Sequence, residues 1–325
     1  MKHSLVRASA GRVAALALTG LLTTGCANAP VPTAQPSIDD SSPGTTLTVY
    51  ATTGYLADAV ANIAPDARVT TMVGPGGDPH TYQPSTRDIQ TIQAADVVLW
   101  NGLHLEAQMI DQLTSLGDRQ LAVGDQLPAE SLLDWPETDH EGNPLRDPHV
   151  WNSPVAWSRV VELVAAKLGE ADPGNAAAYQ GNAANYLKQI EDAAAEAGRL
   201  LATIPDGARI LITGHDAFNY FGATYGLEVH ATDFVSTEAA LSPQQLSDLA
   251  ALIAEREVPV IFQDNQANPQ AITSLKEAVR ARGWEVEISD QELYADSLGA
   301  EPGVDTYLGV FMHNARAVAE ALGTL

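Results

Sequence analysis

Cysteine and basic residues are both scarce in this chain of 325 residues. Cys26 is the only cysteine, which excludes a disulfide within the chain and a metal site built on thiolates. Lysine and arginine number 17 against 41 aspartate and glutamate residues, so the formal net charge is −24. This balance argues against binding nucleic acid or anionic lipid through the protein surface. It is compatible both with attraction of cations and with simple solubility outside a cell.

Long apolar runs are also missing after the N-terminal segment, so we expect no part of the folded chain to cross a membrane. The N-terminal segment has its own pattern: Lys2, Arg7 and Arg12 give it positive charge, and residues 13–22 are apolar. This apolar stretch is too short to span a bilayer comfortably. The pattern is typical of a secretory signal peptide, which we assign to residues 1–25.

The signal peptide leads into the run Leu22-Thr23-Thr24-Gly25-Cys26, which resembles a bacterial lipobox, although Thr23 stands where leucine is more usual. In that motif the peptidase cuts before the cysteine, and the thiol then carries a diacylglycerol. We therefore expect a lipid on Cys26, followed by a flexible tether over residues 26–45. The protein is then held at the membrane through the lipid only. The alternative is a plain secretory signal with an incidental cysteine.

Beyond the tether, short apolar runs alternate with helical patterns. The predicted strands cover residues 47–51, 68–73, 96–100, 208–213, 227–232, 258–263 and 284–289. The predicted helices lie near residues 55–63, 154–168, 216–225, 243–256, 269–282 and 304–323, with a further helix capped by Ser85. Short strands that alternate with helices indicate an α/β fold with parallel sheets. The stretch 132–146 is polar and rich in turn residues.

One predicted helix, over residues 176–203, is much longer than the others. At ~1.5 Å per residue it spans about 40 Å, which is long for a helix inside a small domain but suits a bridge between two lobes. We therefore expect an N-terminal α/β lobe over residues 46–172, a linking helix over 173–203 and a C-terminal α/β lobe over 204–325.

Three histidines follow predicted strands or loops at positions where a site could form. Asp-Pro-His occurs twice, ending at His80 and at His149, and His215 follows an apolar strand after a single glycine. Ligands of parallel α/β sheets bind beyond the carboxyl ends of the strands, and imidazole is the commonest protein ligand for transition metals. Asp78 and Asp147 each precede an imidazole by two residues, so we expect them to orient the rings. Each histidine taken alone is more simply explained as a polar loop residue.

The motifs resemble those of the zinc/manganese solute-binding proteins of ABC transporters. The similar segments are residues 76–84, 147–151, 213–221, 293–298 and 306–307. They occur in the family's order, and the resemblance covers the chain from about residue 46 to the end. It implies two α/β lobes joined by one long helix, and it implies a fourth ligand, the carboxylate of Asp296. It also implies an extracytoplasmic, monomeric binding protein that passes its ion to a membrane permease.

Three imidazoles and one carboxylate saturate a tetrahedral ion, whereas a catalytic zinc keeps one position open. The chain has no His-Glu-x-x-His helix, and neither Ser153 nor Thr213 has an identifiable base partner. We therefore predict a binding protein that has no catalytic cofactor and is not an enzyme. The alternatives are a cell-surface zinc-dependent hydrolase, with Asp216 or Glu238 as its base, and an adhesin-type surface lipoprotein.

The expected ion is Zn²⁺ or Mn²⁺. Three nitrogens and a carboxylate suit zinc, which also stands above manganese in the Irving–Williams order. Dedicated zinc members of the family have a long His-rich loop, whereas the stretch 134–141 is short and has one histidine, His140. We expect His140 to be exposed and three further histidines to be structural, namely His104, His230 and His313. For release, we expect small lobe movements and the withdrawal of at least one ligand, for which the second-lobe pair His215 and Asp296 are the candidates.

Overall fold

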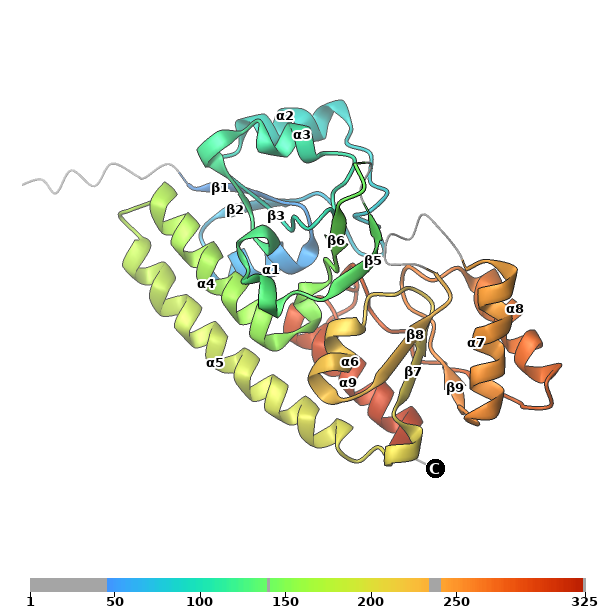
Figure 1. Cartoon of the computed structure of the whole chain (residues 1–325). Coiled ribbons are helices and arrows are strands. Elements are labelled where there is room, and N and C mark those ends of the chain that lie inside the picture. Colours follow the sequence, from blue (N-terminus) through green and yellow to red (C-terminus); the bar gives the residue numbers. More distant parts are fainter. Residues whose placement is uncertain (1–45, 139–140, 234–240, 324–325) are drawn as a thin grey trace, which may run out of the picture. The chain divides into compact units, whose positions relative to one another are not determined.

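A four-stranded parallel sheet organises the first part of the described chain. The computed structural model describes residues 46–138, 141–233 and 241–323 (Figure 1). The strands run in the order β2-β1-β3-β4. Their bounds are β1 (Thr48–Ala51), β2 (Arg68–Thr71), β3 (Val97–Trp100) and β4 (Gln120–Ala122). All neighbouring pairs are parallel, as the alternation of strands and helices predicts.

Helices cover both faces of this sheet, because successive side chains of its strands point to opposite sides. Val49 and Leu99 face α1 (Gly54–Ile63) and join the largest apolar core. Tyr50 and Val98 face the other way, into a smaller core that also holds Ile92 and Leu113. This second face is covered by α2 (Thr86–Ala94) and α3 (Ile110–Thr114), as Figure 1 shows. The central strands are therefore buried on both sides.

The described part of the second lobe contains two two-stranded parallel sheets that lie side by side. Its strands are β7 (Ile210–Thr213), β8 (Glu228–Ala231), β9 (Val260–Ile261) and β10 (Glu287–Ile288). β7 pairs with β8 and β9 pairs with β10, both in parallel. The amide of Phe262 donates to the carbonyl of Ile212 at 2.8 Å, which sets β9 beside β7. One face packs against α7 (Pro243–Glu255) and α8 (Pro269–Arg280), and α6 (Asn219–Tyr225) follows β7.

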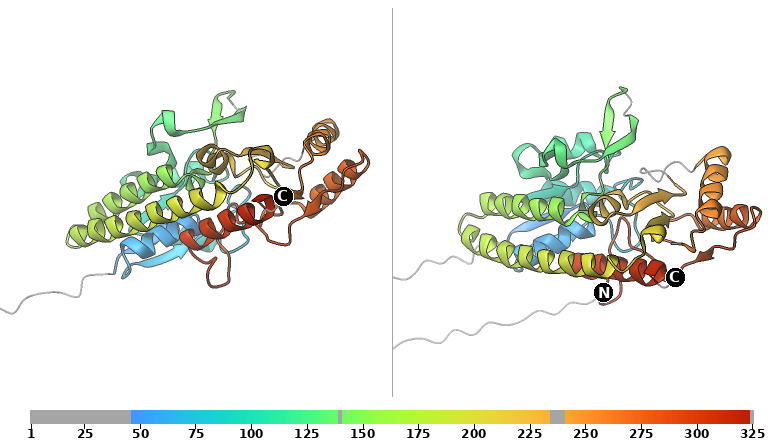
Figure 2. Two further views of the ribbon diagram at one scale, coloured as in Figure 1. Left: turned by 90° about the horizontal axis from the view of Figure 1, so that it is seen from below. Right: turned by 60° about the horizontal axis from the view of Figure 1, so that its bottom comes forward.

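Three long helices join the two lobes through a common core. They are α4 (Pro154–Ala171), α5 (Ala176–Leu201) and α9 (Tyr307–Gly323). α5 packs against α4 and α1 of the first lobe and against α9 of the second, and Figure 2 shows it running alongside α4 and α9. Its buried face includes Tyr186 and Ile190, which belong to the same apolar core as Leu211 of β7 and Phe262, the residue after β9. The predicted architecture of two α/β lobes joined by a long helix is confirmed.

The stretch 132–146 is more regular than its polar sequence indicates. It contains an antiparallel hairpin of β5 (Asp134–Thr138) and β6 (Pro144–Arg146). β4 is a strand that the apolar pattern does not predict, because its three residues are too few to give a periodic signal. No helix in the described ranges is long and apolar enough to cross a membrane. The predictions for residues 1–45, Cys26, His140 and Glu238 lie outside the described residues.

Candidate metal centre

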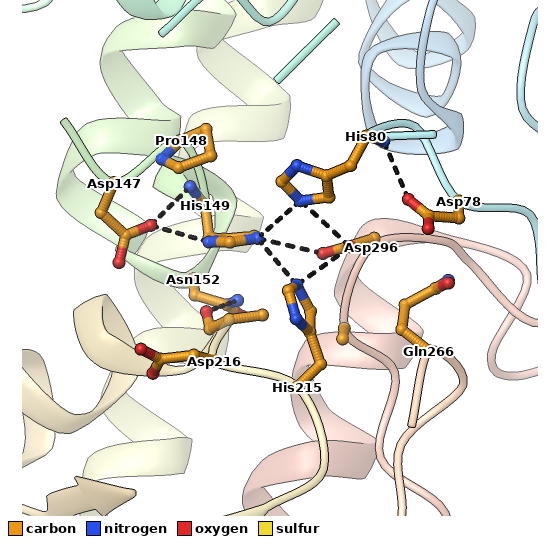
Figure 3. A network of polar contacts seen from close by, with 12 residues as sticks. Asp78, His80, Asp147, Pro148, His149, Asn152, His215, Asp216, Gln266 and Asp296 are labelled. Atoms are coloured by element: carbon orange, nitrogen blue, oxygen red, sulfur yellow. Dashed lines mark hydrogen bonds and ion pairs between the residues drawn. The ribbon is translucent and has the colours of Figure 1, made fainter. Parts of the chain in front are cut away.

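The structure brings His80, His149, His215 and Asp296 together at the junction of the two lobes (Figure 3). His80 lies in the loop after β2, and His149 precedes the short 3₁₀ helix η4 (Val150–Asn152). His215 follows β7 by two residues, and Asp296 lies between β10 and α9. All four side chains are buried, and each offers a ligand atom within 4.8 Å of the others.

The spacing of the four groups fits one small tetrahedral ion. Nε2 of His149 lies 3.3 Å from Nε2 of His80 and 3.2 Å from Nε2 of His215. The Asp296 oxygens lie 3.5, 3.3 and 3.2 Å from the Nε2 atoms of His80, His149 and His215. A tetrahedral zinc with bonds of about 2.0–2.1 Å places its ligand atoms about 3.3–3.4 Å apart. The donor set already has the dimensions of the shell that it would form.

The Asp296 carboxylate has no ordinary hydrogen-bond partner. Among the described residues, neither of its oxygens accepts a hydrogen bond, and both are buried. The polar atoms that approach it are the three imidazole nitrogens. An ionised carboxylate removed from water and from donors is costly unless a positive charge lies beside it. The site therefore has the electrostatics of a cation site.

Asp147 fixes the orientation of the His149 ring. Its Oδ1 accepts a hydrogen bond from Nδ1 of His149 at 2.7 Å and from the His149 amide at 2.9 Å. With the proton on Nδ1, the lone pair of neutral His149 lies on Nε2, which faces Asp296. Asp147 is itself held from the second lobe, because Asn219 donates to its Oδ2 at 3.1 Å and Tyr220 donates to its carbonyl at 2.9 Å.

Asp78 organises the loop that carries His80. Its Oδ1 accepts from the His80 amide at 2.8 Å, and its Oδ2 accepts from the Thr81 hydroxyl at 2.9 Å. Gly76, two residues earlier, adopts a φ of +71°, a region that favours glycine. The two Asp-Pro-His motifs thus share a contact from the carboxylate to the histidine amide, and Asp147 adds a contact to the ring.

Hydrogen bonds also fix the backbone at Gly214 and His215, as they do at the other two histidines. Asp264 accepts from the amides of Gly214 and His215 at 2.9 and 2.8 Å. A Cβ atom at Gly214 would lie 2.2 Å from Cβ of Ala267, so only glycine fits between β7 and the histidine. Composition does not reveal Asp264, because it is one of 41 acidic residues in the chain.

The ionisable groups of the site act on one another's pKa values. Burial favours a neutral Asp296, but the imidazoles of His215 and His149 outweigh burial and hold the pKa of Asp296 well below its usual range. Burial also lowers the pKa of His80 despite Asp296. Burial also lowers the pKa of His149, but the carboxylates of Asp147 and Asp296 outweigh burial and raise that pKa to about 10. The metal-free site is thus arranged to hold positive charge, either as a proton or as a cation.

A further buried carboxylate, Glu106, binds the loop that follows β3. It accepts from the Thr52 hydroxyl at 2.6 Å and from the amides of Asn101 and Gly102 at 2.8 and 3.1 Å. The Asn101 side chain in turn donates to the carbonyl of Pro148, directly before His149, at 2.9 Å. Sequence patterns did not single out Glu106, because a buried acid and an exposed acid look alike in sequence.

The remaining histidines and hydroxyls with a predicted role lie in structural contacts. His230 pairs with Glu228 at 2.9 Å, and His313 contacts the carbonyl of Glu292 at 2.8 Å. His104 adopts a φ of +71° in the loop that Glu106 supports. Two hydroxyls considered as nucleophiles also have local partners: Ser153 caps α4, and Thr213 donates to the carbonyl of His215.

Comparison with known proteins agrees with this geometry. A family model described as zinc-uptake complex component A, periplasmic, matches residues 49–321. The manganese-binding lipoprotein MntA of Bacillus subtilis (strain 168) is 34% identical over 316 residues, which cover 96% of this chain and 99% of that protein. The zinc-binding protein TroA of Treponema pallidum (strain Nichols) is 36% identical over 278 residues, covering 84% and 88%. The solved structure of the periplasmic zinc-binding protein TroA from Treponema pallidum matches with a TM-score of 0.80 at 34% identity, covering 86% of this chain and 99% of that one.

Proposed function

We propose that this chain, which belongs to the family of zinc-uptake complex component A, captures a divalent transition metal outside the cytoplasm and delivers it to an ABC permease. His80, His149, His215 and Asp296 are the four ligands in this proposal. The single observation that carries it is the buried Asp296 carboxylate, whose oxygens face three Nε2 atoms at 3.2–3.5 Å. A cation at the centre satisfies all four groups at once.

The ion is Zn²⁺ or Mn²⁺, and the site has features that suit each. Three imidazoles and a carboxylate at tetrahedral spacing favour zinc, as does the Irving–Williams order. Both Asp296 oxygens face the imidazoles, so a larger ion can gain a fifth contact from the same side chain. Two similar proteins, MntA and TroA, are named for manganese and zinc respectively. Availability of the two ions then decides which one the protein carries.

The family is one of solute-binding transport proteins and not of enzymes. In our proposal the protein acts as a monomer, and a lipid on Cys26 holds it at the outer face of the membrane. The name of the relative MntA, a lipoprotein, supports this placement. The common core of the two lobes supports small movements on release, because a wide opening would expose the apolar residues that the lobes share.

Competitive titration of metal-stripped protein with Zn²⁺ and Mn²⁺, read together with the metal content of the protein as purified, tests the proposal. Asp296→Ala should lose metal affinity, because a closed shell of four ligands would be reduced to three. Asp290→Ala removes an exposed acid from the same segment and serves as the matched control.

A cell-surface hydrolase that uses Asp296 only as an outer residue would keep its metal in Asp296→Ala. That result, or a metal-bound structure with any of the four side chains more than roughly 3 Å from the ion, would contradict the proposal.

A further inference from the structure

The carbonyl of Ala295, directly before Asp296, receives two hydrogen bonds from the first lobe. The Tyr55 hydroxyl donates to it at 2.8 Å, and Nε1 of Trp151 donates at 2.9 Å. Tyr55 belongs to α1 and Trp151 to η4, whereas Ala295 follows β10 of the second lobe. All three residues are buried, so water does not compete for these bonds. One peptide group thus joins the two lobes beside the fourth ligand.

The two donors form one rigid unit with the metal centre. The rings of Tyr55 and Trp151 stack, with centroids 4.9 Å apart and an interplanar angle of 18°. Trp151 also meets the ring of His149 edge-on, with centroids 5.3 Å apart. The positions of both donors are therefore coupled to that of a ligand in the first lobe. Neither donor touches the Asp296 carboxylate by a hydrogen bond, so their effect on Asp296 passes through the backbone.

The other side of the Asp296 segment is held by a residue of its own lobe. Asn265 accepts from the Ala295 amide at 2.8 Å and donates to the carbonyl and hydroxyl of Ser297 at 2.9 and 2.8 Å. The Ser297 hydroxyl also accepts from the amide of Gly76 in the first lobe at 3.0 Å. The segment thus forms hydrogen bonds with both lobes, and donors of the first lobe bind on each side of Asp296.

We propose that Tyr55 and Trp151 are positioning residues for the metal site, which hold Asp296 in its ligating place by binding the Ala295 carbonyl. This inference rests on the proposed metal-binding function. The peptide before Asp296 has few other restraints from the first lobe, and a carboxylate ligand must be placed within a fraction of an ångström. The two donors bring the fourth ligand to the imidazoles of the first lobe, although the chain connects it to the second lobe.

Because of this attachment, the backbone contacts of Asp296 differ from those of His215, although both residues belong to the second lobe. The backbone of His215 is held by Asp264 of the second lobe, whereas the backbone beside Asp296 is held both by aromatic donors of the first lobe and by Asn265 of the second. When the lobes move apart, the first-lobe donors should keep Asp296 near His80 and His149, so we expect His215 to be the ligand that leaves first. The two second-lobe ligands therefore do not withdraw as a pair.

Tyr55→Phe tests the proposal, because it removes the hydroxyl donor and keeps the ring stack. Zn²⁺ affinity, measured by competition with a chelator, should fall about tenfold, the effect of one buried hydrogen bond. The visible absorption of the Co²⁺-loaded variant should also change, because it reports the geometry of the ligand shell. Tyr225→Phe is the matched control, since its hydroxyl donates to the carbonyl of Ala194 at 3.3 Å far along α5.

A double-mutant cycle separates positioning from a general loss of stability. If Tyr55 acts through Asp296, Tyr55→Phe should cost little further affinity in an Asp296→Ala background. Equal losses in both backgrounds, or wild-type affinity and spectrum in Tyr55→Phe, would overturn the proposal. Should Tyr55→Phe fail to fold, Trp151→Phe removes the other donor and is read in the same way. Failure of the wild-type protein to bind any metal would instead reject the proposed function.

Discussion

Oδ1 of Asp147 accepts a hydrogen bond from Nδ1 of His149 at 2.7 Å, and both side chains are fully buried. This contact leaves Nε2 of His149 to face the other three proposed ligands, so in our proposal the carboxylate acts on the metal site without touching the ion. It also links the site to the second lobe, because Asn219 donates to the same carboxylate.

Replacing Asp147 should weaken metal binding without removing a ligand. We expect Asp147→Ala to lower the affinity for Zn²⁺ about 10- to 100-fold, because the His149 ring loses both its orientation and its negative partner. Asp147→Asn keeps an acceptor and should lose less. Isothermal titration measures both, with Asp192→Ala on the exposed face of α5 as the control. An unchanged affinity in Asp147→Ala would show that the ring is held by other contacts.

A methyl group at Gly214 should disturb the site through the backbone. Gly214→Ala would place its Cβ 2.2 Å from that of Ala267 and 2.9 Å from the Asp264 carboxylate that holds the His215 loop. We expect a loss of about 1–3 kcal/mol in the free energy of unfolding, together with weaker metal binding. Gly181→Ala in α5 is the matched control, because its added methyl meets no atom within 4 Å. That control should be neutral or stabilising by up to about 1 kcal/mol, since alanine favours a helix.

Metal uptake should release a proton. Burial opposes the charged form of His149, but Asp147 and Asp296 outweigh it and raise the pKa to about 10 in the metal-free protein. His149 is therefore protonated on both nitrogens near neutral pH, and an incoming cation displaces the proton from Nε2. We expect about one proton released per ion at about pH 7.5, and an affinity that rises with pH up to the folded pKa. Calorimetry in buffers of different ionisation enthalpy counts the protons, and a heat that does not depend on the buffer would contradict this.

Glu106 should make the metal-free protein less stable as the pH rises through the weakly acid range. Burial raises its pKa from 4.5 to about 7, although Thr52, Asn101 and Gly102 donate to it. The folded state thus binds the Glu106 proton more tightly than the unfolded state. The contribution of Glu106 to stability therefore falls as the pH rises from about 4.5 to about 7, and it is constant at higher pH. The loss is about 3 kcal/mol. Urea unfolding in the presence of a chelator should show this slope in the wild type and in the exposed control Glu130→Gln.

Glu106→Gln should lose that slope while being less stable throughout, because an amide nitrogen then faces one of the backbone donors. A slope that persists in Glu106→Gln would assign it to other groups.

The sequence allows much of this arrangement to be predicted, but not all of it. Local patterns predict the helix cap at Ser85 and the strands that precede His80 and His215. These patterns are the spacing of apolar residues and the positions of glycine and proline, which affect only neighbouring residues. His80, His149 and His215 are noticeable because histidine is uncommon and each follows a turn. Only the family resemblance predicts Asp296 as a ligand, because no local sequence pattern distinguishes it from the 40 other acidic residues.

The supporting contacts were beyond prediction for a different reason. Tyr55 and Trp151 appear in the sequence as ordinary core aromatics, and their donor atoms matter only because Ala295 lies opposite them in the folded protein. Separations of 240 and 144 residues between these partners leave no local pattern. The strand β4 has no signal of its own in the sequence, because its three residues form a strand by pairing with β3.

The burial of the four proposed ligands should determine how fast an ion can be exchanged. His149, His215 and Asp296 have no exposed surface, and His80 retains 4%. An ion among them cannot meet a chelator until the protein opens, so its escape rate should reach a plateau as chelator concentration rises. Residence time is then set by the frequency of opening and not by the strength of the bonds alone. A transporter that holds the open form would speed delivery without any change in the ligands themselves.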